Sequence, residues 1–177
     1  MQSDEELIES ANKGQADAFE TLYYRYRDWV YRLAWRFTGS RDQALDVLQE
    51  TFFYLLKKFP GFKLSCSITT FLYPVVKHVS LAVRRKASRT VSEDDALVET
   101  PAPAATDGGA SRLELAAVLA GLPEEQREVL LMRFVDDMSL QEIAGALEVP
   151  LSTAKSRLYR GLEALRRDAR AKEYFLD

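Results

Sequence analysis

The sequence has very few residues that could form disulfides or bind transition metals: Cys66 is its only cysteine and His78 its only histidine. A disulfide within one chain needs two cysteines, and a structural zinc site takes about four Cys or His ligands. The sequence also shows no nucleophile paired with a base, no phosphate-binding glycine loop and no metal-ligand spacing. We therefore expect no disulfide, no metal, no cofactor and no enzymatic activity.

Long apolar runs and a basic N-terminus are also missing. No stretch reaches the roughly 20 apolar residues that a transmembrane helix requires. The sequence begins with MQSDEELIES, which is acidic, whereas a signal peptide begins with basic residues and continues with apolar ones. These absences predict a cytoplasmic protein that does not insert into a membrane.

Apolar periodicity divides the chain into two helical blocks. Residues 90–112 lack any apolar period and combine prolines and glycines with five acidic residues against one basic residue, which is typical of a linker. We predict an all-α protein with two small domains, residues 1–89 and 113–177, joined by this flexible acidic linker.

Local signals in the first block predict where its helices begin and end. Ser3 and Ser40 precede apolar stretches with a period of three to four residues, and serine is a preferred N-cap. Gly39 is expected to end the long helix before Ser40, because glycine readily adopts the left-handed conformation found at helix ends. The helix after Ser40 is expected to extend to Pro60.

The second block ends with the layout of a helix-turn-helix. In SLQEIAGALEVPLSTAKSRLYRGLEAL, residues 139–165, a short helix capped by Ser139 precedes a tight turn and a longer helix capped by Ser152. Glu148 stands where such turns usually have glycine. We expect it to adopt a left-handed conformation at modest cost.

The longer of these two helices separates apolar from basic residues. Its apolar stripe consists of Ala154, Leu158, Leu162 and Leu165. Residues 150–172 carry seven Lys or Arg against two Asp or Glu, although the whole chain has a net charge of −3. Because the start of this helix enters the DNA major groove in a helix-turn-helix, the positive charge lies where a polyanion would dock.

We predict two kinds of DNA contact on this helix. The candidates for reading base edges in the major groove are Lys155, Ser156 and Tyr159. The candidates for phosphate contacts are Thr153, Arg157 and Arg160. The alternative is a solvated basic face on a helical hairpin, which charge alone does not exclude.

Two long stretches of the sequence resemble one family, in the same order. LPEEQREVLLMRFVDDMSLQEIAGALEVPLSTAKSRLYRGLEALR resembles region 4 of bacterial RNA polymerase sigma factors of the extracytoplasmic-function type. AFETLYYRYRDWVYRLAWRFTGSRDQALDVLQETFFYLLKKFPGF resembles regions 2.1 and 2.2 of the same family.

The resemblance implies a transcription initiation factor that binds core RNA polymerase through the β′ clamp helices and the β flap. Such a factor directs the polymerase to promoter DNA, where region 4 reads the −35 element and region 2 recognises and melts the −10 element. The resemblance also implies that an anti-sigma factor holds the free protein.

A polymerase contact is implied at DVLQE, where Asp46, Gln49 and Glu50 match the residues that bind the clamp helices in this family. Their spacing of i, i+3 and i+4 places them on one helix face, where they can accept hydrogen bonds from arginines. From the residues alone, a solvated polar face remains an alternative.

The resemblance places −10 recognition in GFKLSCS, residues 61–67, and in the helix that follows. Capture of an unstacked base needs a pocket and positive charge for single-stranded phosphates. The candidates are Lys63, Lys77, His78, Arg84 and Arg85. This stretch departs from the family at Phe71, Pro74, His78 and Ala82. Pro74 should kink the helix or shift its start, because proline lacks the backbone N–H, and His78 is alternatively a structural residue.

Two other functions remain open from the sequence. A free-standing helix-turn-helix regulator would bind operators as a dimer without polymerase, although no heptad seam for self-association is visible. A helical adaptor that has lost promoter melting would account for the changes at Pro74 and His78. The aromatic residues Tyr23, Trp29, Tyr31 and Trp35 have helical spacing and are expected mainly to pack in a core.

Overall fold

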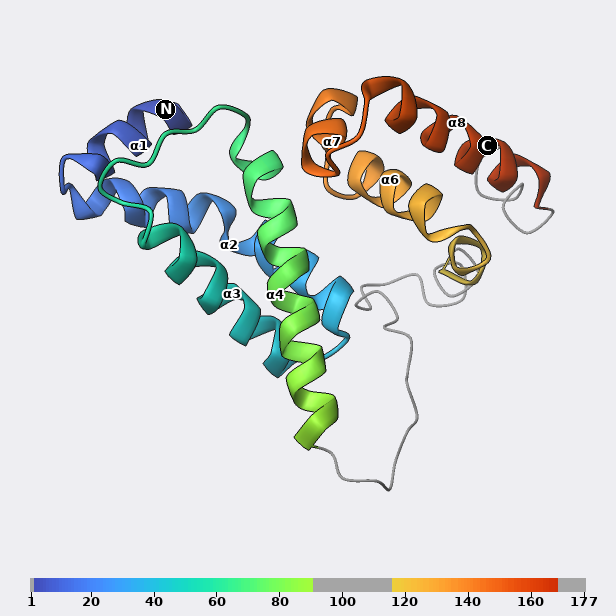
Figure 1. The fold of residues 1–177 in the computed structure, drawn as a ribbon, viewed down its shortest axis with the longest axis horizontal. Helices are drawn as coiled ribbons and strands as arrows, with labels where there is room; N and C mark the ends of the chain where they lie inside the picture. The colour runs from blue at the N-terminus through green and yellow to red at the C-terminus, as the bar shows by residue number, and fades with distance from the viewer. Residues whose placement is uncertain (1, 91–115, 169–177) are drawn as a thin grey trace. The chain divides into compact units, whose positions relative to one another are not determined.

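The computed structural model describes residues 2–90 and 116–168 of the 177. All regular secondary structure in these two segments is helical, which confirms the predicted all-α class (Figure 1). The chain divides into two compact units, Met1–Pro101 and Ala102–Asp177. Most of the predicted linker, residues 90–112, lies outside the described residues.

The first unit contains α1 (Asp4–Asn12), α2 (Ala16–Thr38), α3 (Arg41–Leu56) and α4 (Ile68–Thr90). Ser3 and Ser40 are N-caps as predicted, since each side chain accepts a hydrogen bond from the backbone N–H three residues later. Gly39 ends α2 with a φ of 69°, which glycine adopts without steric cost. α3 ends at Leu56, earlier than expected, because the residue before Pro60 is disfavoured in a helical conformation.

Helices α2, α3 and α4 pack around one apolar core, and α1 lies against α2 (Figure 1). The fully buried side chains include Leu22, Val30, Leu33, Val47, Leu55, Leu72 and Val76. Asp4 fixes α1 to α2, since its carboxylate accepts hydrogen bonds from Arg25 and from the Tyr26 hydroxyl. Burial and this hydrogen bond raise the pKa of Tyr26 above its ordinary value.

Helix α4 begins at Ile68 and continues through Pro74, so the expected shift of its start does not occur. Pro74 is exposed, whereas its neighbours Leu72, Tyr73 and Val76 are buried. A proline inside a helix costs about 3 kcal/mol, but burial of an apolar side chain contributes roughly 1.5–3 kcal/mol. The buried neighbours together therefore outweigh the cost of the proline.

The described part of the second unit contains α6 (Glu124–Phe134), α7 (Leu140–Ala146) and α8 (Leu151–Arg167), preceded by helical residues 116–120. Ser139 caps α7 as predicted, in a capping box with Glu142. The buried core includes Val129, Leu130, Met132, Ile143, Ala154, Leu158 and Leu165. Leu162, which was predicted for the same stripe, is half-buried.

The turn between α7 and α8 contains the left-handed residue that the sequence predicted. Glu148 has a φ of 53°. The Val149 N–H donates to the Ala144 carbonyl at 3.0 Å and closes the turn. The two helices of the helix-turn-helix are therefore joined by a compact, hydrogen-bonded connection.

The prediction that Ser152 caps α8 is wrong. Pro150 is the N-cap residue, and the helix has no side-chain cap. The Pro150 carbonyl accepts hydrogen bonds from the N–H groups of Thr153 and Ala154 at 2.9 and 3.1 Å. Because proline holds φ near the helical value, the helix begins at Leu151, before the serine.

Candidate nucleic-acid interface

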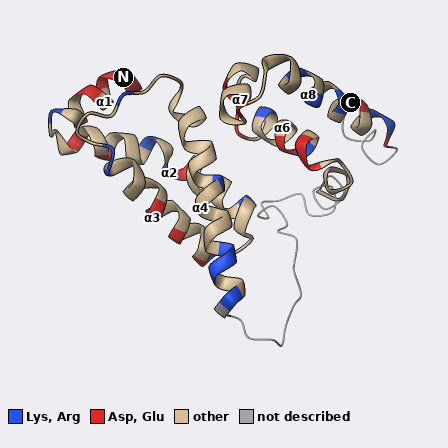
Figure 2. Cartoon of the chain, in the orientation of Figure 1, with Lys and Arg blue, Asp and Glu red and all other residues tan. Residues whose placement is uncertain are grey.

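The first half of α8 presents cationic and aromatic side chains to solvent, and Figure 2 shows the basic positions along this helix. Lys155, Tyr159 and Arg160 are exposed, and Tyr159 is 65% accessible. Thr153 and Ser156 are half-buried beside them, and the Ser156 hydroxyl donates to the Thr153 carbonyl at 3.0 Å. An exposed tyrosine ring adds little to the core, so this surface is suited to contact with another molecule.

Arg157 does not share this exposed surface. Its Nη2 lies 2.9 Å from Oε1 of Glu125 in the first turn of α6, and its side chain is 21% exposed. Gly161 follows Arg157 by four residues, so the two lie on the same side of α8. That side faces α6, because Gly161 lies against Leu130 and Gln126 of α6. Among the six predicted DNA contacts, Arg157 is therefore the one that forms an ion pair with another residue described by the structure.

The position of α8 depends on Gly161. A Cβ at this position would lie 2.8 Å from Cδ1 and 3.2 Å from Cγ of Leu130, so any larger residue requires the Leu130 side chain to move or the two helices to separate. Sequence reasoning did not identify this contact. The available signal was a glycine in the interior of a helix, where it is intrinsically unfavourable.

A second exposed surface lies on α3. Asp46, Gln49 and Glu50 are all exposed, as their spacing predicted. The same side of the helix carries three large apolar side chains, Leu45, Phe53 and Leu56, which are 43%, 54% and 47% exposed. We call these six residues the α3 face. The combination of acidic and exposed apolar side chains is typical of a protein-binding surface.

Sequence reasoning missed the apolar part of the α3 face. The available signal was the presence of apolar residues outside the buried stripe that includes Val47 and Leu55. Lys57 lies over the Phe53 ring, 4.2 Å from its centroid, and covers part of it.

The candidate residues for −10 recognition do not form one cluster. Along α4, His78, Arg84 and Arg85 are exposed and Lys77 is half-buried. The Arg84 Nη1 donates to the Phe37 carbonyl at 3.2 Å. Lys63 lies in the loop before α4, and a rise of about 1.5 Å per residue separates Arg84 from the start of the helix by roughly 24 Å. Lys63 and Arg84 therefore cannot contact the same nucleotide.

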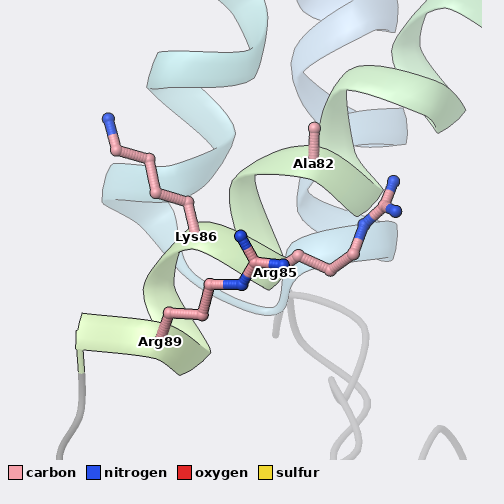
Figure 3. Close-up of a pocket in the computed structure, with 4 residues that line it drawn as sticks. All are labelled: Ala82, Arg85, Lys86 and Arg89. Carbon is pink, nitrogen blue, oxygen red and sulfur yellow. The ribbon is translucent and has the colours of Figure 1, made fainter.

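The end of α4 forms a shallow cationic hollow (Figure 3). It is lined by Ala82, Arg85, Lys86 and Arg89. No acidic side chain is among these lining residues, and Ala82 stands where the resembled family usually has aspartate. Three of the four lining residues are cationic, which favours an anion such as a phosphate over a cation.

The four aromatic residues of α2 that were expected to pack are half-buried, namely Tyr23, Trp29, Tyr31 and Trp35, whereas their neighbour Tyr24 is exposed. The rings of Tyr31 and Trp35 lie 5.7 Å apart, and those of Tyr23 and Phe52 lie 4.8 Å apart, both in edge-to-face geometry.

Within residues 2–90 and 116–168, no helix has the length and apolar composition needed to cross a lipid bilayer. Across the same residues, no three His, Cys, Asp or Glu side chains gather as they would around a metal ion.

Comparison with known families gives two matches that together include both surfaces. Residues 22–90 match the family described as Sigma-70 region 2, and residues 112–165 match the family described as Sigma-70, region 4. The α3 face lies within the first match and α8 lies largely within the second.

Curated relatives match the chain over most of its length. The extracytoplasmic-function (ECF) RNA polymerase sigma factor SigW of Bacillus subtilis is 29% identical over 177 residues, which cover 92% of this chain and 95% of the relative. The RNA polymerase sigma-H factor of Pseudomonas aeruginosa is 27% identical, with 93% of each chain covered. The ECF RNA polymerase sigma-E factor of Escherichia coli is 29% identical, with 92% of each covered.

Solved structures share the fold at lower sequence identity. CnrH, in complex with the cytosolic domain of CnrY, aligns with a TM-score of 0.67 and 20% identity, covering 92% of this chain and 94% of that one. The sigma factor RpoE of Bartonella quintana, in complex with the anti-sigma factor NepR, aligns with a TM-score of 0.64 and 20% identity, covering 88% and 94%.

Proposed function

Because the chain belongs to the sigma-70 family of RNA polymerase sigma factors, in its extracytoplasmic-function group, we propose that it recruits core RNA polymerase to promoters through two chemically opposite surfaces. The observation that carries this proposal is the exposure of a cationic surface on α8 and an acidic, apolar surface on α3 (Figure 2). The protein acts in the cytoplasm, beside the polymerase, and performs no bond chemistry itself.

Helix α8 reads the −35 element in the major groove. Lys155, Ser156 and Tyr159 contact base edges, since they occupy the exposed or half-exposed first turns of the helix. Thr153 and Arg160 contact phosphates. Arg157 reaches a phosphate only by leaving Glu125, so its contribution is reduced by the free energy of that ion pair.

The α3 face binds the clamp helices of the polymerase β′ subunit. Asp46, Gln49 and Glu50 accept hydrogen bonds from basic side chains of the partner, and the exposed apolar side chains Leu45 and Phe53 become buried between the two proteins. In the second unit, the β flap covers the end of α6, where two neighbouring apolar residues are exposed by 60% and 53%. These residues are Phe134 and Val135.

The loop of residues 61–67 and helix α4 recognise and melt the −10 element. The loop receives an unstacked base, and His78 with the cations along α4 holds the displaced single strand. Because Lys63 and Arg84 lie at opposite ends of this path, they contact different nucleotides. On α4, Lys77 lies between these two residues in sequence, and Arg85 is next to Arg84.

An anti-sigma factor holds the free protein. The solved structure of RpoE from Bartonella quintana contains the anti-sigma factor NepR. The exposed apolar side chains of the α3 face and of α6 give such a partner a surface to cover in the absence of polymerase.

Reconstituted transcription tests this proposal. The purified chain is mixed with core RNA polymerase and a pool of random-sequence templates, and specific run-off transcripts are expected. The double variant Gln49→Ala, Glu50→Ala should abolish them, whereas Glu20→Ala removes the same single charge from an exposed position on α2 and should not. Full activity of the double variant would refute the clamp assignment. Sequence-specific DNA binding by the chain alone, with no effect on polymerase, would refute the proposed function.

A further inference from the structure

One side chain of α1 is hydrogen-bonded to the loop that precedes α4. The Asn12 Oδ1 accepts hydrogen bonds from the N–H groups of Gly61 and Phe62 at 2.6 and 3.0 Å. The Asn12 Nδ2 donates to the Phe62 carbonyl at 2.8 Å. The Asn12 side-chain amide thus satisfies backbone N–H and C=O groups of the loop that have no partner in a regular helix or sheet. Asn12 and these loop residues are 49–50 residues apart in the sequence.

Both ends of the loop are held, and its middle is exposed. The buried Phe62 ring lies 5.4 Å from the ring of Phe59 and 5.1 Å from that of Phe71. At the other end, the Ser67 hydroxyl accepts a hydrogen bond from the Thr70 N–H at 3.3 Å, as an N-cap of α4 does. The exposed residues between these ends are Lys63, Ser65 and Cys66.

We propose that Asn12 is a positioning residue for promoter melting, which fixes the loop of residues 61–67 in the shape that receives an unstacked base. This inference rests on the proposed function. Gly61 has a φ of 98° and is free of a side chain, so without the Asn12 amide this point of the loop has many accessible conformations. A loop that is ordered in advance does not lose that freedom when the base enters.

Helix α1 is a suitable support for this role. Its first turn is attached to α2 through Asp4, Arg25 and Tyr26, and its last residue, Asn12, holds the loop (Figure 1). The N-terminal end of the loop is therefore tied to α1 as well as to the chain that leaves α3.

The test compares three variants of the full chain, each assembled with core polymerase on a promoter that the wild-type holoenzyme has selected from a random pool. Asn12→Ala removes all three hydrogen bonds, and Asn12→Asp keeps the two acceptor bonds but replaces the donor by a carboxylate oxygen that faces the Phe62 carbonyl. Lys13→Ala is the matched control. Lys13 is the next residue after Asn12, and its replacement breaks only an exposed ion pair with Glu9. Closed-complex affinity is measured in the cold, and opening is followed by permanganate reactivity of −10 thymines on warming.

We expect Asn12→Ala to slow opening about tenfold, the equivalent of roughly 1.4 kcal/mol in the barrier, while closed-complex affinity stays at the wild-type value. Asn12→Asp should be intermediate, and Lys13→Ala should open promoters as the wild type does. Opening of Asn12→Ala at the wild-type rate would overturn the inference. Equal losses in closed-complex affinity and opening would also overturn it, because they indicate general destabilisation. If the wild-type holoenzyme itself opens no promoter, the proposed function fails.

Discussion

Replacing Glu125 by glutamine should strengthen the binding of the holoenzyme to duplex DNA. Arg157 of α8 is paired with Glu125 of α6, with 2.9 Å between Nη2 and Oε1. If Arg157 contacts a phosphate in the complex, it must first give up this carboxylate. Glu125 and the DNA phosphate then compete for one guanidinium, and removing the carboxylate removes the competition.

The exposure of the two side chains sets the expected size of the effect. The Glu125 side chain is 67% exposed and that of Arg157 is 21% exposed, so the pair is partly screened by water. Such pairs contribute about 0.2–1 kcal/mol, which corresponds to an affinity gain of roughly 1.4-fold to fivefold on its release. Because phosphate contacts carry no sequence information, the gain should be equal on preferred and random DNA. Because Arg157 neutralises the same phosphate in both proteins, the slope of log affinity against log salt should change by much less than the roughly 0.9 expected for an additional phosphate contact.

The assay is a double-mutant cycle with Arg157→Ala, measured by fluorescence anisotropy over a salt series. Glu124→Gln is the control, because it removes the same charge from the same first turn of α6, where Glu124 makes no ion pair with any described residue. The gain from Glu125→Gln should disappear when Arg157 is absent. An equal gain with and without Arg157 would refute the competition, since it would then arise from net charge alone.

Two further predictions concern α8. Lys155→Ala should weaken binding at preferred −35 sequences by about 1–3 kcal/mol and relax the choice of base at one position; affinities for a set of single-base variants measure this, and an equal loss on random DNA would show that Lys155 reads no base. Gly161→Ala should lower the free energy of unfolding of the second unit by up to about 2 kcal/mol, because the new Cβ would lie 2.8 Å from Cδ1 of Leu130 and overpacking costs about 1–3 kcal/mol, of which the higher helix propensity of alanine returns about 1 kcal/mol. Denaturant titration measures that change, and a raised midpoint would mean that Leu130 rotates away without cost.

Helix ends were predictable from the sequence where a local interaction determines them. The Ser3 and Ser40 caps and the left-handed Glu148 each depend on atoms within four residues of the chain. The prediction failed at Ser152 because two residues only two positions apart both suit a helix start, and the restricted φ of Pro150 places the start first.

Features that depend on packing between helices were not predictable in this way. The pairing of Arg157 with Glu125 depends on which flank of α8 faces α6, and the two residues are far apart in sequence. The hydrogen bonds of Asn12 likewise join segments separated by 49–50 residues. The residue types of the α3 face were visible in the sequence, but the exposure of Leu45 and Phe53 depends on where α2 and α4 contact α3.

The α3 face also has a consequence for how copies of this chain behave toward one another. Its apolar side chains lie beside the carboxylates of Asp46 and Glu50 on the exposed half of the helix. Two copies that met through this surface would bring carboxylate against carboxylate at short range, where like charges repel. A partner rich in arginine or lysine meets the same leucine and phenylalanine side chains and gains attraction instead. The carboxylates therefore disfavour dimerisation through the surface that is open to a basic partner.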